Sequence, residues 1–212
     1  MSNSRITISI ACFGRPERTK RAIQCILDQD ITNWEAFIMG DCCPDFQKLI
    51  DSGYLETIKK EQEAKGNIIH YFNASVNGGG CGYKLINHAI QNATGSFLVF
   101  FANDDVILPD HFSHYLSEIE DSKYDLVYYN SNLAPLHADR DTHLAISAIG
   151  HCDIIVRTSL AKTISPHTEK YTHDWDFIKE VASKGRVKKA SSKRATYRVM
   201  RLGSVPKIEF ID

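Results

Sequence analysis

Residues 97–110, FLVFFANDDVILPD, run from an apolar stretch directly into a turn rich in acidic side chains. The apolar part, Phe97–Ala102, is typical of a strand that is covered on both faces of a sheet. Two adjacent carboxylates, Asp104 and Asp105, follow it. Like charges repel, and desolvation at the end of a buried strand adds to the cost of ionising both side chains. We therefore expect a positive group to lie against them.

Strands and helices alternate along the chain before this stretch. We expect strands at 6–13, 34–39 and 67–72, and helices at 16–27, 46–58 and 85–93, the second of them interrupted near Ser52 and Gly53. This order predicts an α/β fold with a mostly parallel central sheet and helices on both faces. Ligands of such sheets bind beyond the carboxyl ends of the strands.

The second half of the chain is less regular. We expect a helix after Pro109, a strand at 125–129, a helix at 173–184 and two strand-like pieces at 186–190 and 195–199. Residues 131–152 read as one long loop, of the kind that is usually functional or mobile. Its histidines, His137, His143 and His151, do not have metal-ligand spacing, which favours surface or structural roles.

Composition and charge narrow the class of protein. A chain of 212 residues suits one domain, and 43% hydrophobic with 24% charged residues is ordinary globular composition. A formal net charge of −1 provides no overall field for nucleic acid or for an anionic membrane. We therefore expect no nucleic-acid partner, and any anion site has to be local.

Neither a leader nor a membrane span is expected. The apolar residues 6–13 are too short for a signal peptide, and no stretch approaches the roughly 20 apolar residues of a spanning helix. Six cysteines show no C-x-x-C pairing. We interpret them as reduced thiols of a soluble, cytoplasmic protein.

The two carboxylates after the fourth strand are the first candidates for chemistry. Oxygen ligands at the end of a rigid strand suit Mg²⁺ or Mn²⁺, which would let Asp104 and Asp105 both stay ionised. The alternative is a plain strand-to-helix turn in which one aspartate caps the next helix. The residues themselves leave both readings open.

Further candidates lie at the other strand ends. Asp41 can accept from a nucleobase or ribose, or can be a turn aspartate. The glycines at 78–80 can let the backbone approach a nucleotide closely, or can be a simple turn. No Gly-Lys-Ser/Thr follows them, so they are not a P-loop. Lys84 can reach a phosphate or base, or can be an ordinary surface lysine.

One carboxylate in the second half is a candidate general base. Asp174 lies in THDWDF, beside Trp175, whose flat apolar face suits a sugar ring. The alternative is that Asp174 only favours the start of its helix.

Taken in order, these segments resemble the inverting GT-A glycosyltransferases of family 2. The opening strand, turn and helix match in ISIACFGRPERTKRAIQCILDQ, and the second strand with its base-contacting acid matches in WEAFIMGD. The later segments are NGGGCGYKLINHAI, FLVFFANDDVILPD, HDWDFIKEVASKGRV and ATYRVMRLGSV. With 212 residues, the chain resembles a minimal glycosyltransferase module. Such a module can be one domain of a larger multi-domain polypeptide, of the kind that large DNA viruses encode.

The resemblance implies a GT-A fold in one domain, with residues 1–105 binding a nucleotide sugar and residues 106–212 binding the acceptor. It implies an inverting transfer of a hexose or deoxyhexose from a nucleotide diphosphate sugar, most simply a UDP-sugar, to a glycan or glycoprotein. Asp174 would be the catalytic base. Mn²⁺ or Mg²⁺ would bind chiefly to Asp105, with Asp104. The donor residues would be Phe13, Arg15, Asp41, Asn77, Gly79, Lys84 and Asp104, and the acceptor residues Trp175, His173 and His151.

The chain departs from the family pattern at four positions. Ala102 stands where the family usually has the first Asp of its metal motif, and His173 stands where the family has a Glu. Leu85 replaces an expected Asn, and Met200 replaces a common His. These departures keep open a non-catalytic nucleotide-sugar or glycan-binding module. A sugar nucleotidyltransferase is the other alternative, which the first turn, CFGRPERTKR, fits poorly because it lacks a glycine-rich loop with a lysine.

Overall fold

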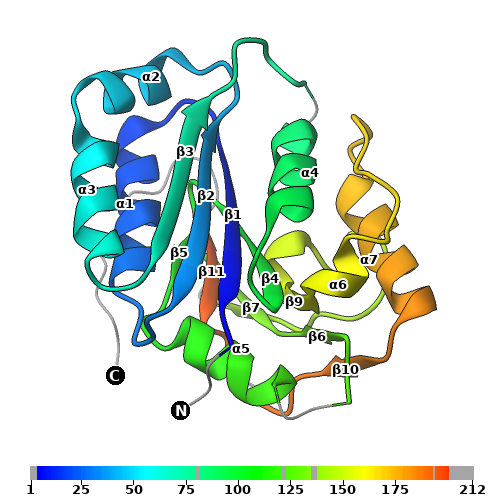
Figure 1. The fold of residues 1–212 in the computed structure, drawn as a ribbon. Coiled ribbons are helices and arrows are strands. Elements are labelled where there is room, and N and C mark those ends of the chain that lie inside the picture. Colours follow the sequence, from blue (N-terminus) through cyan, green and yellow to red (C-terminus); the bar gives the residue numbers. More distant parts are fainter. Residues whose placement is uncertain (1–3, 80–81, 121–122, 135–137, 193, 201–212) are drawn as a thin grey trace.

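The computed structural model describes residues 4–79, 82–120, 123–134, 138–192 and 194–200 (Figure 1). Gly80, His137 and the residues from Arg201 onward, which the sequence analysis named, lie outside these ranges. A large sheet has the strand order β10-β6-β9-β4-β1-β2-β3. Its strands are β1 (Ile6–Cys12), β2 (Trp34–Gly40), β3 (Ile68–Asn73), β4 (Phe97–Ala102), β6 (Leu126–Tyr128), β9 (Ile154–Arg157) and β10 (Val187–Lys189).

Most neighbours in this sheet are parallel, as the alternation of elements predicts. β1 pairs in parallel with β2 and β4, β2 with β3, and β6 with β10. The exception is β9, which lies antiparallel between β4 and β6. We did not expect β9 from the sequence. Its reversed direction brings the residues before it to the edge where β1, β2 and β4 end.

A second sheet has the order β5-β11-β7-β8. Its strands are β5 (Val106–Ile107), β7 (Ser131–Ala134), β8 (Ala138–Arg140) and β11 (Tyr197–Met200). The expectation of one long loop at 131–152 is therefore wrong, because β7 and β8 form a hairpin there and β7 pairs with β11. Only β11 overlaps a strand that the sequence predicted.

Helices cover both faces of the large sheet, which confirms the predicted layers (Figure 1). Their bounds are α1 (Pro16–Leu27), α2 (Pro44–Asp51), α3 (Tyr54–Glu63), α4 (Tyr83–Asn92), α5 (His111–Ile119), α6 (Thr158–Ala161) and α7 (His173–Lys184), with a 3₁₀ turn η2 (His151–Asp153). α1, α2, α3 and α5 share one apolar cluster with β1, β2 and β4. α4, α6 and α7 pack on the opposite face.

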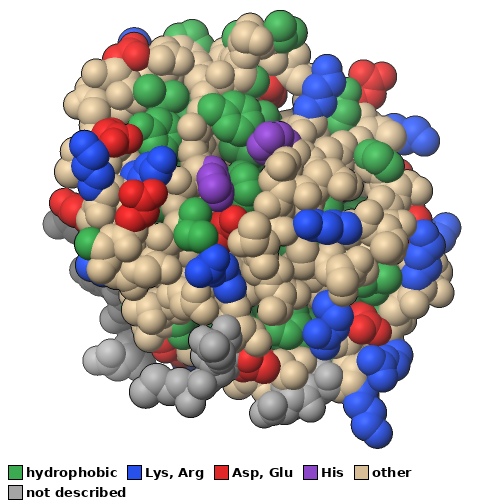
Figure 2. Space-filling model, viewed as in Figure 1, with side chains coloured by type: hydrophobic (Ala, Val, Ile, Leu, Met, Phe, Trp, Pro, Cys, Tyr) green, Lys and Arg blue, Asp and Glu red, His purple; other side chains and the backbone are tan. Residues whose placement is uncertain are grey.

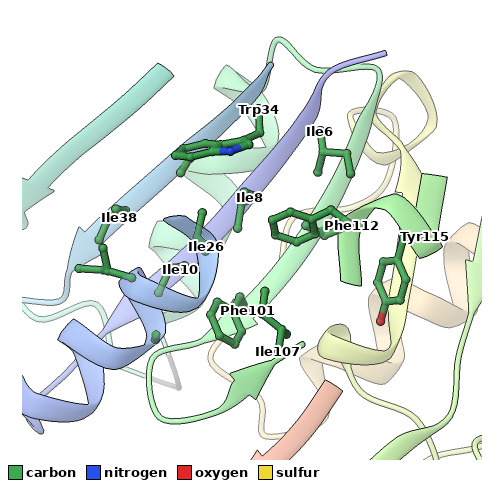
Figure 3. Packing of buried hydrophobic residues seen from close by; sticks show 14 of the residues in the cluster. Ile6, Ile8, Ile10, Ile26, Trp34, Ile38, Phe101, Ile107, Phe112 and Tyr115 are labelled. Carbon is green, nitrogen blue, oxygen red and sulfur yellow. The ribbon is translucent and has the colours of Figure 1, made fainter. Parts of the chain in front are cut away.

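Isoleucines and aromatic rings fill the first of these layers (Figure 3). Ile6, Ile8 and Ile10 alternate along β1 and are fully buried, and Trp34 and Phe112 are 1% exposed. Burying side chains of this size contributes roughly 1.5–3 kcal/mol each. The sheet is therefore a stiff base for the loops at its upper edge in Figure 1.

Charged side chains of both signs are spread over the surface, with lysines and arginines frequent beside α6, α7 and β10 (Figure 2). Five basic residues of this part of the chain form ion pairs: Lys184 with Glu180, Arg186 with Asp125, Lys188 with Glu118, Lys189 with Asp141, and Arg194 with Asp110. Neighbouring carboxylates therefore compensate the positive charge of these five residues. Among the described residues, no helix has the length and apolar character needed to cross a membrane.

One carboxylate is buried within the large sheet. Glu35 on β2 accepts hydrogen bonds from the Thr7 hydroxyl at 2.7 Å and from the Thr94 backbone N–H at 2.8 Å. Its other oxygen accepts from the Thr94 hydroxyl and lies 3.2 Å from His70 Nε2. Burial acts to raise the pKa of Glu35, but the hydrogen bonds from Thr94, Thr7 and His70 outweigh it and hold the pKa below its usual value. Glu35 therefore links β1, β2, β3 and the segment after α4.

Replacing Glu35 with glutamine should lower the free energy of unfolding at pH 7 by about 2 kcal/mol, because charge-assisted hydrogen bonds are lost. A carboxyl with a depressed pKa in the folded state stabilises above its unfolded pKa and loses that effect as the pH falls through the folded pKa. The difference from the wild type should therefore shrink below about pH 4.5. Urea unfolding from pH 3 to 8 measures it, and Glu17→Gln, on an exposed glutamate, is the control. If the difference in the free energy of unfolding stayed constant from pH 3 to 8, the depressed pKa of Glu35 would be contradicted.

Candidate functional site

A cavity of about 1060 Å³ opens at the edge where β1, β2 and β4 end. The turn after β1, the loop after β3, the segment before β9 and the start of α7 also contribute to its walls. Of the side chains predicted for a site, it brings together Phe13, Arg15, Asp41, Asn77, Gly79, Asp104, His151, His173, Asp174 and Trp175. Lys84 and Asp105 are not in its lining.

Asp41 fixes the loop that follows β3. Its side chain is buried and accepts a hydrogen bond from Gly78 N–H at 2.7 Å, while the Asn77 amide donates to its backbone carbonyl at 3.2 Å. A Cβ at Gly78 would lie 3.3 Å from the Asp41 carboxylate, so the backbone approaches closely here. Gly79 takes a φ of +68°, which glycine adopts without strain. Lys84 is exposed, with its ammonium over the Tyr83 ring.

The turn after β1 has a left-handed backbone at two consecutive residues. Gly14 has a φ of +60° and Arg15 a φ of +53°, immediately before Pro16 starts α1. A non-glycine residue in this region is uncommon. The turn exposes the Phe13 ring at the cavity, with 60% of the residue accessible. It also carries the Arg15 side chain toward the end of β4.

Arginines from α1 and the turn before it meet the first of the two adjacent carboxylates. The Arg15 guanidinium contacts the Asp104 carboxylate, and Arg18 Nη1 lies 4.0 Å from it. Arg21 donates to the Asp104 carbonyl at 2.8 Å. The expected positive group is therefore present in the protein itself. The Asp104 side chain keeps 20% of its surface accessible at the cavity.

The second carboxylate serves a different part of the molecule. Asp105 is 5% exposed and accepts hydrogen bonds from the Tyr197 hydroxyl and the Met200 N–H, both at 2.8 Å. Burial raises its pKa to about 7, with Asp104 and Asp153 acting in the same direction against those hydrogen bonds. Asp105 thus joins the end of β4 to β11. Of the two adjacent carboxylates, Asp104 lines the cavity and Asp105 does not, and the role of Asp105 as the chief metal ligand stays a prediction.

Asp174 lines the cavity from the first turn of α7, with 39% of its side chain exposed. Its Oδ1 is 3.3 Å from His173 Nδ1 and 3.6 Å from His151 Nδ1. Trp175 lines the same cavity and is partly buried. A carboxylate that is accessible to solvent and held between two imidazoles is suited to accept a proton from a ligand hydroxyl.

Two of the nearby histidines are neutral at pH 7. Burial lowers the pKa of His151 to about 4, with Asp174 opposing and His173 assisting the shift. Burial, helped by His151 and His173, lowers the pKa of His167 to about 2. His151 also stacks on Phe100, with ring centroids 4.5 Å apart.

The sequence analysis missed part of the cavity wall. Arg140, Gly150 and Cys152 line it, and Tyr171 stands at its mouth with 91% of the residue exposed. Arg140 pairs with the buried Asp153, which also accepts from Gly150 N–H. None of these residues stands in a spacing that a sequence pattern could single out. His167 was missed for the same reason.

Comparisons with known proteins relate this architecture to enzymes that transfer sugars. The family model described as glycosyl transferase family 2 matches residues 7–146, well over half of the chain. The WcaA protein of Escherichia coli K12, named for glycosyl transfer in colanic acid biosynthesis, is 28% identical over 116 residues. That match covers 55% of this chain and 38% of WcaA.

Solved structures share the fold. Staphylococcus aureus TarS residues 1–349, solved with UDP-GlcNAc, superpose with a TM-score of 0.73 at 16% identity. The match covers 94% of this chain and 60% of that one. The mannosyltransferase PcManGT from Pyrobaculum calidifontis, solved with GDP-Man and Mn²⁺, has a TM-score of 0.71 at 13% identity, covering 98% and 59%. The chain thus has a GT-A fold and spans less than two thirds of each of these chains.

Proposed function

This chain belongs to glycosyl transferase family 2, and from that premise we propose that it is an inverting, metal-dependent glycosyltransferase. The donor is a nucleotide diphosphate sugar, with a UDP-sugar as the first candidate, because TarS was solved with UDP-GlcNAc. The transferred group is a hexose or deoxyhexose, and the acceptor is a hydroxyl of a glycan or glycoprotein. The cavity between the two halves of the chain is the reaction site.

One observation carries this proposal. A single cavity holds Asp41 and Asp104 at the strand ends and Asp174 on the wall that α7 provides. Asp41 and the glycine loop that it fixes supply a close backbone surface for a nucleoside. The diphosphate then lies toward Arg15 and Arg18, whose positive charge attracts it. Asp174 and Trp175 face the sugar and the acceptor.

Asp104 would hold the divalent cation, which would compete with Arg15 for the carboxylate. Mg²⁺ and Mn²⁺ are commonly bound through one or two carboxylates, with water and substrate phosphates as the other ligands. Asp104 is the carboxylate that supplies this ligand from the end of β4, because Ala102 has no donor and Asp105 is engaged by β11. Mn²⁺ or Mg²⁺ held there would stabilise negative charge on the departing diphosphate. The arginines around Asp104 contribute to the same stabilisation.

Asp174 acts as the general base. It removes the proton from the acceptor hydroxyl as that oxygen attacks the anomeric carbon on the face opposite the diphosphate. The bond from the anomeric carbon to the phosphate oxygen breaks in the same step, and its electron pair leaves with the nucleoside diphosphate. One displacement inverts the configuration of the sugar.

The test is nucleoside diphosphate release from a panel of UDP- and GDP-sugars, with and without Mn²⁺. Slow hydrolysis of one donor without acceptor is enough to support the proposal. Pyrophosphate release from a nucleoside triphosphate and a sugar phosphate would instead indicate a nucleotidyltransferase. Binding of a nucleotide sugar by calorimetry without any turnover would favour the binding module. If no nucleotide sugar is bound or hydrolysed, the proposal is wrong.

Asp41→Asn should raise KM for the donor about tenfold while leaving kcat little changed, because it weakens ground-state contacts far from the reacting bond. Initial rates over a range of donor concentrations measure both constants. Asp45→Asn is the matched control, since Asp45 lies in the first turn of α2 and pairs with Lys48. A drop in kcat with an unchanged KM would place Asp41 in the chemistry rather than in donor binding.

A further inference from the structure

Three histidines from separate segments meet beside the cavity. His151 comes from η2, His167 from the segment between α6 and α7, and His173 from the first residue of α7. All three are buried, and a ring nitrogen from each lies within 4.8 Å of those of the other two. The donor site at Asp104 uses none of them.

Two of these rings have a nitrogen with no hydrogen bond. Within the described part of the chain, His151 Nε2 and His167 Nε2 are buried and without a partner. An unsatisfied buried polar atom costs free energy, and native structures leave few of them. An unprotonated imidazole nitrogen in such a position offers a lone pair to a metal ion.

The Nδ1 atoms of the three rings already have contacts, and those of His167 and His173 lie 3.3 Å apart. His167 Nδ1 lies 3.2 Å from the His173 carbonyl oxygen. The Nδ1 atoms of His151 and His173 lie 3.6 Å and 3.3 Å from the Asp174 carboxylate. Imidazoles that bind a metal through one nitrogen are almost always oriented by a carbonyl or carboxylate at the other. The cluster thus has the outer contacts of a histidine metal site.

We propose that His151, His167 and His173 form a binding site for a zinc-class divalent transition metal. The ligands are Nε2 of His151, Nε2 of His167 and a ring nitrogen of His173. Imidazole suits Zn²⁺ and its neighbours, whereas Mg²⁺ and Mn²⁺ prefer oxygen. Bonds of about 2.0–2.1 Å place the ligand atoms of a tetrahedral site about 3.3 Å apart. The ring nitrogens of the cluster lie within 4.8 Å of one another, so ring rotations that bring them closer by up to about 1.5 Å complete the site.

The fourth position of this site faces the cavity. His151 and His173 line the cavity, whereas His167 is not part of its lining. Three protein ligands with an open fourth position are typical of zinc sites that bind water or a substrate group. Metal binding here does not depend on the proposed transferase reaction.

The experiment measures Zn²⁺ binding to the full chain after removal of metal with EDTA. Competition with a chromophoric chelator gives the affinity, and Co²⁺ absorption gives the geometry and the ligand type. We expect one Zn²⁺ per chain at micromolar concentration or below. We also expect the intense visible bands of tetrahedral Co²⁺ without a thiolate charge-transfer band, which separates this site from the cysteines.

His167→Phe removes one ligand without touching the cavity wall, and Phe suits the neighbouring Phe100 and Phe177 rings. It should weaken Zn²⁺ binding at least tenfold. His88→Gln, on an exposed histidine of α4, should leave binding unchanged. Thermal melting checks that each variant is folded. If His167→Phe is unfolded, Zn²⁺ binding by His173→Gln is compared with that of the wild type instead. Less than one equivalent of Zn²⁺ on the wild type, or equal binding by the wild type and a folded ligand variant, would overturn the proposal.

Discussion

Asp174→Asn should reduce kcat by about 10²–10⁴-fold, which is the usual contribution of a general base. Asparagine keeps the shape of the side chain and an oxygen near His151 and His173, but it cannot take the acceptor proton. Donor affinity should change little, because Asp174 belongs to α7, whereas the proposed nucleoside contacts come from Asp41 and the glycine loop. Rates of sugar transfer and donor binding by calorimetry measure the two quantities separately.

Asp176→Asn is the matched control for this change. Asp176 lies on the same helix two residues later, is exposed and is not in the cavity lining. Its variant should keep the wild-type kcat. If Asp174→Asn retained more than about a tenth of the wild-type kcat, Asp174 would not be the base. Its role would then be limited to favouring the start of α7.

The second large effect is expected for Asp104→Ala. Loss of the carboxylate at the end of β4 should remove several kcal/mol of stabilisation of the departing diphosphate, which corresponds to at least about a 10²-fold loss of kcat/KM. The response to added Mn²⁺ should disappear in the same variant. Activity against Mn²⁺ concentration, with EDTA-treated protein as the starting point, measures both effects.

Asp105→Asn separates the two adjacent aspartates. Because Asp105 contacts Tyr197 and Met200 inside the protein, its variant should alter the melting temperature but keep the wild-type dependence on Mn²⁺. The opposite pattern, with Mn²⁺ dependence lost in Asp105→Asn and kept in Asp104→Ala, would return the metal to Asp105.

The first half of the fold could be predicted because its signals are local. Apolar runs of strand length alternate with helical periodicity from β1 to β4, and each helix has a turn residue at its boundary. Parallel pairing and the convergence of Asp41 and Asp104 at one edge follow from that order alone. The second half could not be read in this way. β9 has only four residues, and its antiparallel place between β4 and β6 depends on contacts distant in sequence.

The roles of Asp104 and Asp105 show a different limit. The two residues are adjacent and chemically identical, so no pattern tells which one faces the ligand. Which carboxylate faces the cavity depends on Tyr197 and Met200, almost a hundred residues later in the chain. These two residues donate hydrogen bonds to Asp105 and hold it at the junction between the two sheets. The histidine cluster is similar, because His151, His167 and His173 are unevenly spaced and meet only after the chain has folded.

The reversed direction of β9 has a consequence for how this architecture can diversify. The turn η2 enters the cavity ahead of a strand, whereas Asp41 and Asp104 enter it after strands. Insertions or deletions between β8 and η2 can therefore reshape one wall of the cavity while the register of β1, β2 and β4 stays fixed. Selection can therefore change which ligand the segment before β9 recognises without changing the strand ends of β1, β2 and β4. The two surfaces of the cavity can evolve separately.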